Sequence, residues 1–148
     1  MIRLAEPHDA EAICRLLAKA ITGSAVQQST QLAQQLSRTT ALMLVDTEQE
    51  RVVGTIVGQI VHDEAEIHDV AIEQRFRRQG RAKQLVRSFE EHAALRGAQQ
   101  SFLEVRASNS PAIHLYETLG YGTRGNRRGY YSDGEDAIVM NKTLGQTA

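Results

Sequence analysis

The stretch from Ile67 to Phe89 constrains the fold of this chain more than any other segment. It begins with a short apolar run, which is typical of a buried strand, and it ends with apolar residues at helical spacing. A turn rich in arginine, glutamine and glycine separates the two parts. We therefore predict a strand, a tight loop and a helix in direct succession.

The loop of this unit is a candidate phosphate-binding site. The first turn of a helix has backbone N–H groups without partners, and the helix dipole adds positive charge there. Several cationic side chains occupy the same place, although a solvated basic helix start without a ligand remains the alternative. The loop consists of Arg77, Arg78, Gln79, Gly80, Arg81, Ala82 and Lys83.

The spacing of small residues in the loop distinguishes between phosphate-binding motifs. Ala82 and Leu85 occupy positions where a dinucleotide motif read through Gly80 needs later glycines, and no Gly-Lys-Ser/Thr sequence occurs. The pattern present is Arg77-x-x-Gly80-x-Ala82, whose small residues let a diphosphate approach the backbone. This pattern resembles the pyrophosphate loop of the GNAT superfamily of acetyl-coenzyme A dependent N-acetyltransferases.

Length and charge narrow the class of protein. The chain has 148 residues, which fits one domain spanning residues 1–148, and its 17 basic and 18 acidic side chains give a net charge of −1. The basic loop is therefore a local feature, and DNA binding by general charge is not expected. The sequence shows neither a signal peptide nor an apolar stretch of membrane length, so we expect a cytoplasmic protein without membrane contact.

The metal-binding potential of the sequence is low. A single cysteine, Cys14, excludes an internal disulfide and a cysteine-based zinc cluster. Histidines and acids between His62 and His68 can share one face of a strand, but this pattern fits a solvated hairpin better than a metal site. We expect no metal cofactor.

The remaining segments predict an α/β (α+β) fold. The strand-to-helix crossovers imply a mixed central sheet of about six or seven strands, flanked by helices on both faces. Gly54 and Gly58 in one strand indicate a bulge or a close backbone approach. Further strands are expected at 1–5, 41–45, 51–61, 101–105 and 137–140, the last returning from a hairpin at 132–134.

Acetyl transfer needs a base for the amine and an acid for the departing thiolate. An α-ammonium titrates near ~8 and a lysine near ~10.4, so a peptide N-terminus is the easier nucleophile. Glu104 is the best candidate base, since partial desolvation on an apolar strand would raise its pKa. The alternative is an ion pair with Arg106 or another arginine. Glu66 and Asp69 are reserve bases.

The stretch EVRASNSPAIHLYETLGY, followed by RRGYYSDGEDAIVM, is similar to the RimI family of bacterial enzymes that acetylate the N-terminal alanine of a small-subunit ribosomal protein. The likeness runs from about Val61 to Met140. It implies acetyl-CoA as co-substrate, direct transfer in a ternary complex, Glu104 as general base and Tyr116 as general acid. Without this likeness, Tyr116 would be interpreted as a core tyrosine. The implied cofactor contacts are Val70, Ala71, Ile72, the loop 77–83 and Asn109.

The first third of the chain departs from the RimI pattern. An aromatic-proline-tryptophan segment normally follows the first helix of that family, whereas here the segment Thr22–Gln31 occupies the region and the chain has no tryptophan. If the RimI pattern holds, the acceptor is the N-terminus of a ribosomal protein. The alternative acceptors are a small-molecule amine, another protein N-terminus or a lysine. A coenzyme A-sensing module without turnover and an RNA-associating protein are the rivals from other classes. Charged and aromatic residues at 124–136 can line an acceptor groove or form a solvated hairpin tip.

Overall fold

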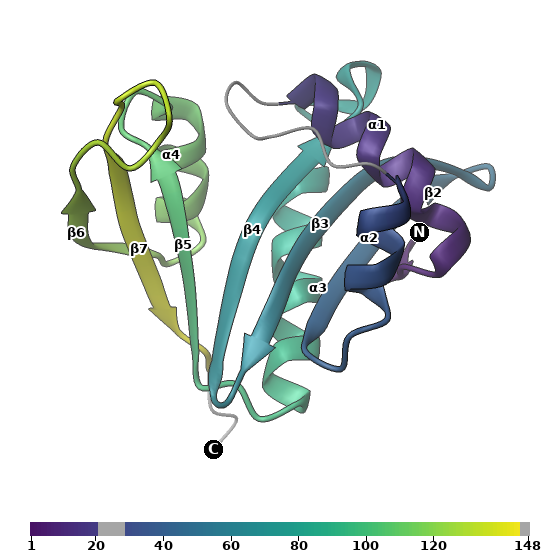
Figure 1. Cartoon of the computed structure of the whole chain (residues 1–148), viewed down its shortest axis with the longest axis horizontal. Helices are drawn as coiled ribbons and strands as arrows, with labels where there is room; N and C mark the ends of the chain where they lie inside the picture. The colour runs from purple at the N-terminus through teal and green to yellow at the C-terminus, as the bar shows by residue number, and fades with distance from the viewer. Residues whose placement is uncertain (21–28, 146–148) are drawn as a thin grey trace.

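The computed structural model describes residues 1–20 and 29–145, and its elements follow one another along the chain as Figure 1 shows. The predicted segment Thr22–Gln31 lies mostly outside the described residues. The elements are β1 (Ile2–Leu4), the 3₁₀ turn η1 (Pro7–Asp9), α1 (Ala10–Ala20), α2 (Ser29–Leu36), β2 (Ala41–Glu48), β3 (Arg51–Val61), β4 (Glu64–Ile72), the 3₁₀ turn η2 (Gln74–Phe76), α3 (Arg81–Leu95), β5 (Gln100–Arg106), α4 (Ser110–Thr118), β6 (Gly122–Arg127) and β7 (Ala137–Thr143).

The strands form one seven-stranded sheet in the order β1-β2-β3-β4-β5-β7-β6. Only β4 and β5 pair in parallel within the described sheet, and the other neighbours are antiparallel. Helices α1 and α2 cover one face, in front in Figure 1, while α3 and α4 pack on the other. This arrangement confirms the predicted mixed sheet with helices on both faces.

The central unit of the prediction is confirmed as β4, a loop and α3. Leu85, Val86 and Phe89 of α3 are fully buried against the sheet, in keeping with their helical spacing. Burying one such side chain stabilises the fold by roughly 1.5–3 kcal/mol. Gly58 of β3 makes room for Phe89, because a Cβ there would lie 2.8 Å from the phenylalanine ring.

One of the irregularities of the sheet bears on the site, namely a bulge of β4 against β3. Val57 pairs with Asp69 and Gly58 pairs with Ile67, so His68 is an extra residue on β4. Directly paired residues point to the same face, and Asp69 therefore shares the face of Val57, which packs in the layer beneath α1. Gly58, for which the sequence indicated a bulge or a close backbone approach, stands opposite this bulge, which reverses the face on which Asp69 would otherwise lie.

The same region marks a divergence between β4 and β5. Their pairing covers Glu64–Ile67 against Gln100–Leu103, and beyond it the two strands separate, as Figure 1 shows. On its other edge, β5 pairs with β7 along its whole length, from Gln100 to Arg106. The wedge between β4 and β5 is therefore lined by residues that follow Ile67 and Leu103.

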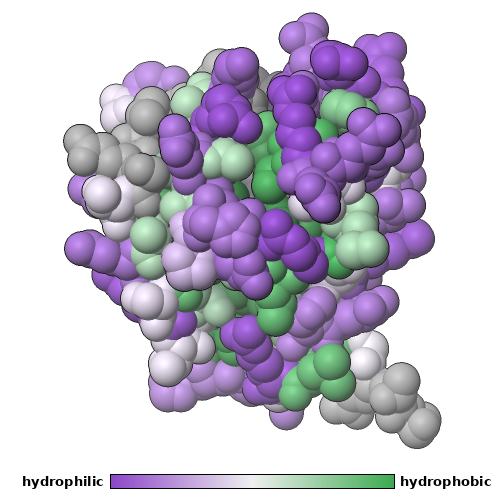
Figure 2. Space-filling view, turned by 90° about the vertical axis from the view of Figure 1, so that its right-hand side faces the viewer, coloured by the Kyte–Doolittle hydropathy of each residue, from purple (hydrophilic) through white to green (hydrophobic). Residues whose placement is uncertain are grey.

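The outer surface beside β2 and α2 is mainly hydrophilic, with hydrophobic residues visible in a narrow band (Figure 2). The strand at this edge, β1, has only three residues. Short edge strands offer little backbone to another chain. Among the described residues, no helix combines the length and the apolar character that crossing a membrane requires.

Candidate active site

A cleft opens between β4, the first turn of α3 and α4. It contains nearly all of the residues for which the sequence predicts a cofactor role near the loop, together with apolar residues that sequence reasoning did not single out. The predicted residues that line it are Val70, Ala71, Ile72, Arg77, Arg78, Gly80, Arg81, Ala82 and Lys83; the additional ones are Phe76, Pro111, Ala112 and Leu115, with Tyr116 at one end.

The loop before α3 turns sharply so that the helix begins at the cleft. Gly80 has φ 76° and Arg78 has φ 63°, both in the left-handed region that favours glycine. The backbone N–H of Gln84 donates to the carbonyl of Gly80, which is the first bond of the helix. The N–H groups of residues 81–83 thus have no partner within the helix, and an anion can accept from them.

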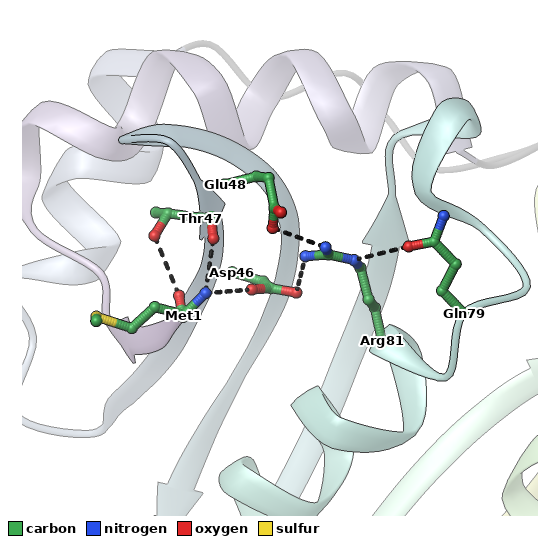
Figure 3. A network of polar contacts seen from close by, with 6 residues as sticks. All are labelled: Met1, Asp46, Thr47, Glu48, Gln79 and Arg81. Atoms are coloured by element: carbon green, nitrogen blue, oxygen red, sulfur yellow. Dashed lines mark hydrogen bonds and ion pairs between the residues drawn. The ribbon is translucent and has the colours of Figure 1, made fainter.

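The Arg81 side chain points toward Asp46 and Glu48 of β2, as Figure 3 shows. Its guanidinium donates to Asp46 at 3.0 Å and to Glu48 at 2.7 Å, and its Nε donates to the Gln79 side chain at 3.4 Å. Gln79 itself lines a separate hollow with Met1 and Asp46 rather than the cleft. Arg81 therefore offers its backbone to a ligand, while its charge joins α3 to β2.

The cationic side chains beside the cleft that stay exposed are Arg77, Arg78 and Lys83. Arg77 is anchored at the cleft edge, because its Nε donates to the carbonyl of Ile72 at 3.0 Å. A diphosphate at the start of α3 would meet these cations as well as the helix N–H groups. The cleft thus suits a ligand with an anionic end and an apolar arm.

A second cavity of about 350 Å³ occupies the wedge between β4 and β5. It meets the first cleft at Val70, Ala112 and Tyr116, which line both. Glu104 and Asn109 also line it, so the structure brings the predicted base, the predicted acid and Asn109 to one place. Asn109 caps α4, and its side-chain oxygen accepts from the Ala112 N–H at 3.2 Å.

Glu104 lies half-buried on the wedge side of β5 and has an arginine partner. That partner is Arg127 of β6, whose Nε lies 3.4 Å from the carboxylate, and not the neighbouring Arg106. The hydroxyl of Tyr130 also hydrogen-bonds to Glu104, which raises the pKa of Tyr130. Glu104 is thus held by groups from residues 122–143, the β6–β7 segment.

Tyr116 is buried where the two cavities meet. Burial, and after it the negative charge of Asp69, raise the pKa of this phenol far above its usual value. The ring lies edge-on to Tyr121, with centroids 5.6 Å apart. Tyr116 therefore stays protonated and can donate its hydrogen to a group in the cavity.

Two acids of the β6–β7 segment pair with Arg106 of β5 and do not line the cavity. Arg106 is buried and donates to Asp133 and Glu135, each at 2.9 Å, while its guanidinium stacks 4.0 Å from the Tyr131 ring. The sequence left open whether the segment lines an acceptor groove or forms a solvated hairpin tip. These two acids hold the segment in position, while Tyr130 and Tyr131 line the cavity.

Asp69 is the residue whose position sequence reasoning missed. It lines the wedge cavity, and burial raises the pKa of its carboxyl to about 7, although the hydrogen bond from the Val70 N–H at 3.0 Å acts the other way. Strict strand alternation puts Asp69 on the side of Ile67. The feature of the sequence that could have indicated the other face is Gly58 on the neighbouring strand, which stands opposite the bulge.

Comparisons with known proteins agree on one family. The model of the acetyltransferase (GNAT) family matches residues 11–121. Among named proteins, the chain is 39% identical over 97 residues to the ribosomal protein bS18-alanine N-acetyltransferase of Escherichia coli (strain K12). That match covers 64% of this chain and 66% of the relative, slightly less than two thirds of the relative's length.

Solved structures extend this likeness over the full fold. The crystal structure of the ribosomal-protein-S18-alanine N-acetyltransferase from Escherichia coli superposes with a TM-score of 0.87 at 30% identity, covering 100% of this chain and 96% of that one. A putative acetyltransferase from Salmonella typhimurium, solved with acetyl-CoA, has a TM-score of 0.86 at 17% identity, covering 100% of this chain and 95% of that one. At that identity the second likeness supports the fold only.

Proposed function

Because the chain belongs to the GNAT family of acetyltransferases, we propose that it transfers the acetyl group of acetyl-CoA to the α-amine at a protein N-terminus. The observation that carries this proposal is the junction of the two cavities, with anion-binding N–H groups on one side and a carboxylate on the other. The N-terminal alanine of a ribosomal protein is the acceptor that we favour, since the Escherichia coli relative is named for that substrate. Such an acceptor would place the reaction in the cytoplasm.

The residues of the first cleft fit coenzyme A. The N–H groups of residues 81–83, with Arg77, Arg78 and Lys83, would bind its pyrophosphate, and Gly80 and Ala82 leave the backbone accessible. The separated edge of β4 at residues 70–72 offers backbone groups to the pantetheine amides, and the apolar lining suits its methyl groups. The bound co-substrate supplies an acetyl group activated as a thioester.

The wedge cavity provides groups for the transfer itself. Glu104 accepts a proton from the attacking nitrogen, directly or through water, and Tyr116 donates one to the leaving sulfur. We propose direct attack without a covalent enzyme intermediate. Cys14 does not suit that role, since it packs in the apolar layer of α1 and burial raises the pKa of its thiol. We also propose that residues 1–148 act as one domain.

A thiol-release assay tests the function. Purified protein, acetyl-CoA and a panel of amines are mixed; the panel holds a peptide beginning with alanine, the same peptide with a blocked N-terminus, a lysine-containing blocked peptide and a polyamine. We expect release with the free alanine peptide and none with its blocked form. Faster release with the polyamine would favour a small-molecule acceptor, and coenzyme binding without release from any amine would identify a sensing module.

A further inference from the structure

An α-ammonium must lose two protons to become an amide, because the nitrogen enters with three hydrogens and leaves with one. Building on the function proposed above, we propose that Asp69 is a second catalytic carboxylate, which accepts the first of these protons from the acceptor ammonium. Glu104 then accepts the second proton as the nitrogen attacks. The two carboxylates line the same cavity from opposite walls, Asp69 on β4 and Glu104 on β5.

The bulge at His68 gives Asp69 this position. Its partner Val57 faces the α1 side of the sheet, and Glu66, paired with Gln59, faces the same side. Glu104 lies on the corresponding side of β5, since its neighbours Leu103 and Val105 pack in the opposite core. An amine that enters the wedge from the α1 side therefore meets both carboxylates.

The surroundings of the two carboxylates differ in charge. Glu104 has Arg127 as an ion-pair partner, with the Arg127 Nε 3.4 Å from its carboxylate. No arginine or lysine among residues 1–20 and 29–145 contributes to the titration of Asp69, whose influences are burial and the Val70 N–H. The titratable or charged groups around Asp69 are Glu66 and His68 on β4, Glu104 and Arg106 on β5, Tyr116 on α4, Tyr130 and Tyr131 in the β6–β7 segment, and Cys14 on α1.

The basicity of Asp69 matches an α-ammonium. Burial raises the pKa of its carboxyl to about 7. The equilibrium for proton transfer to Asp69 from an ammonium of pKa ~8 is therefore unfavourable by a factor of only about ten. An ordinary glutamate of pKa ~4.3 would face a factor of several thousand, and a lysine ammonium of pKa ~10.4 raises the factor for Asp69 to about two thousand. The pair thus favours α-amines over lysines.

Proton transfer to Asp69 also acts on Tyr116. The negative charge of Asp69 is one of the influences that raise the pKa of this phenol. Once Asp69 is neutral, that influence disappears and Tyr116 donates its proton more readily. The protons then balance. The nitrogen gives one proton to Asp69 and one to Glu104, the C–N bond forms and the C–S bond breaks, and the sulfur takes the proton of Tyr116. Tyr116 recovers a proton from one of the two carboxyls, and the proton on the other carboxyl leaves to solvent.

The test is the pH profile of kcat/KM for the alanine peptide in Asp69→Asn and in wild type. We expect the rising limb of wild type near pH 7, and in Asp69→Asn near the ammonium pKa of ~8. The loss should be about tenfold or more at pH 6.5 and should diminish toward pH 9. Asp63→Asn, the same change at an exposed position in the β3–β4 turn, should follow wild type.

Two further measurements separate a catalytic role from a structural one. An acceptor peptide with an electron-poor α-amine, already neutral at pH 7, should restore the rate of Asp69→Asn but not that of Glu104→Gln. A titration of ¹³C-labelled aspartate by NMR should place the Asp69 carboxyl near 7 in the protein without substrate. Unchanged affinity of Asp69→Asn for acetyl-CoA would show that the variant is folded.

The outcomes are distinct. An active wild type with an Asp69→Asn profile that is unshifted, or reduced equally at every pH, would overturn the role of Asp69 and leave the acetyltransferase function standing. A wild type that binds acetyl-CoA and acetylates no amine would overturn both. A shifted limb with rescue by the neutral amine supports the inference.

Discussion

At the scale of single residues, the two carboxylates of the site have different neighbours. Glu104 is paired with Arg127 and contacted by Tyr130, whereas the influences on the Asp69 carboxylate, within residues 1–20 and 29–145, are burial and one backbone donor. Tyr116 is held protonated by burial. These surroundings support the different proton transfers that we propose for the three groups.

Removing the proposed base tests that assignment. Glu104→Gln keeps the shape of the side chain but cannot accept a proton, so kcat for the alanine peptide should fall by about 10²–10⁴-fold. The Kd for acetyl-CoA, measured by calorimetry, should stay within about twofold, since the pyrophosphate contacts lie in the other cleft. Glu117→Gln, an exposed change on α4, is the matched control. Unaltered turnover in Glu104→Gln would exclude it as the base.

Removing the proposed acid has a smaller expected effect. Tyr116→Phe loses only the hydroxyl, and a thiolate of pKa near ~8.5 can still leave, so kcat should fall by about a hundredfold. Tyr121→Phe serves as control, because its hydroxyl bonds to buried Ser101 at 2.7 Å in the core. Single-turnover acetylation measures both variants. Equal losses in both would mean that Tyr116 contributes packing alone.

At the scale of elements, the sequence predicted the unit β4–loop–α3 and placed Glu104 on a strand, because both follow from local periodicity. Side chains alternate regularly along β5, so that Glu104 lies on one face while Leu103 and Val105 pack in the core on the other. What could not be predicted depends on partners distant in sequence. Arg81 binds Asp46 and Glu48 of β2, and Arg106 binds acids of the β6–β7 segment, so their charges are used within the fold.

The bulge on β4 gives a prediction at this scale. In Gly58→Ala the new methyl would clash with the backbone of Glu66 and with the Phe89 ring. Overpacking of this kind typically costs 1–3 kcal/mol, so the free energy of unfolding from urea titration should fall by about that amount. Activity should fall as well, because the bulge sets the position of Asp69. Gly122→Ala, which meets no atom within 4 Å, should change stability by less than about 0.5 kcal/mol.

At the scale of the whole molecule, a raised carboxyl pKa lowers stability at neutral pH. The folded protein binds a proton at Asp69 up to pH of about 7, whereas the unfolded chain releases it near ~3.9. The native state thus binds more protons in that window, and its stability falls as pH rises through it. The cost reaches at most ~4 kcal/mol above pH 7.

Asp69→Asn should therefore stabilise the protein while impairing the reaction. Its free energy of unfolding, measured with urea at pH 5 and pH 8, should exceed that of wild type by a margin that grows with pH. Asp63→Asn should show no such growth, since Asp63 is exposed. Identical pH dependence in wild type and Asp69→Asn would contradict a raised pKa in the folded state.

The separation of β4 from β5 has a practical consequence. Backbone groups that face each other across the wedge are unpaired strand edges inside a sheet, and such edges are templates for any extended peptide. We therefore expect concentrated protein without coenzyme to self-associate more than protein with coenzyme bound. A compound that joins coenzyme A to an extended peptide through the transferred carbon would bridge both edges at once, which makes this interrupted ladder a rational target for inhibitors.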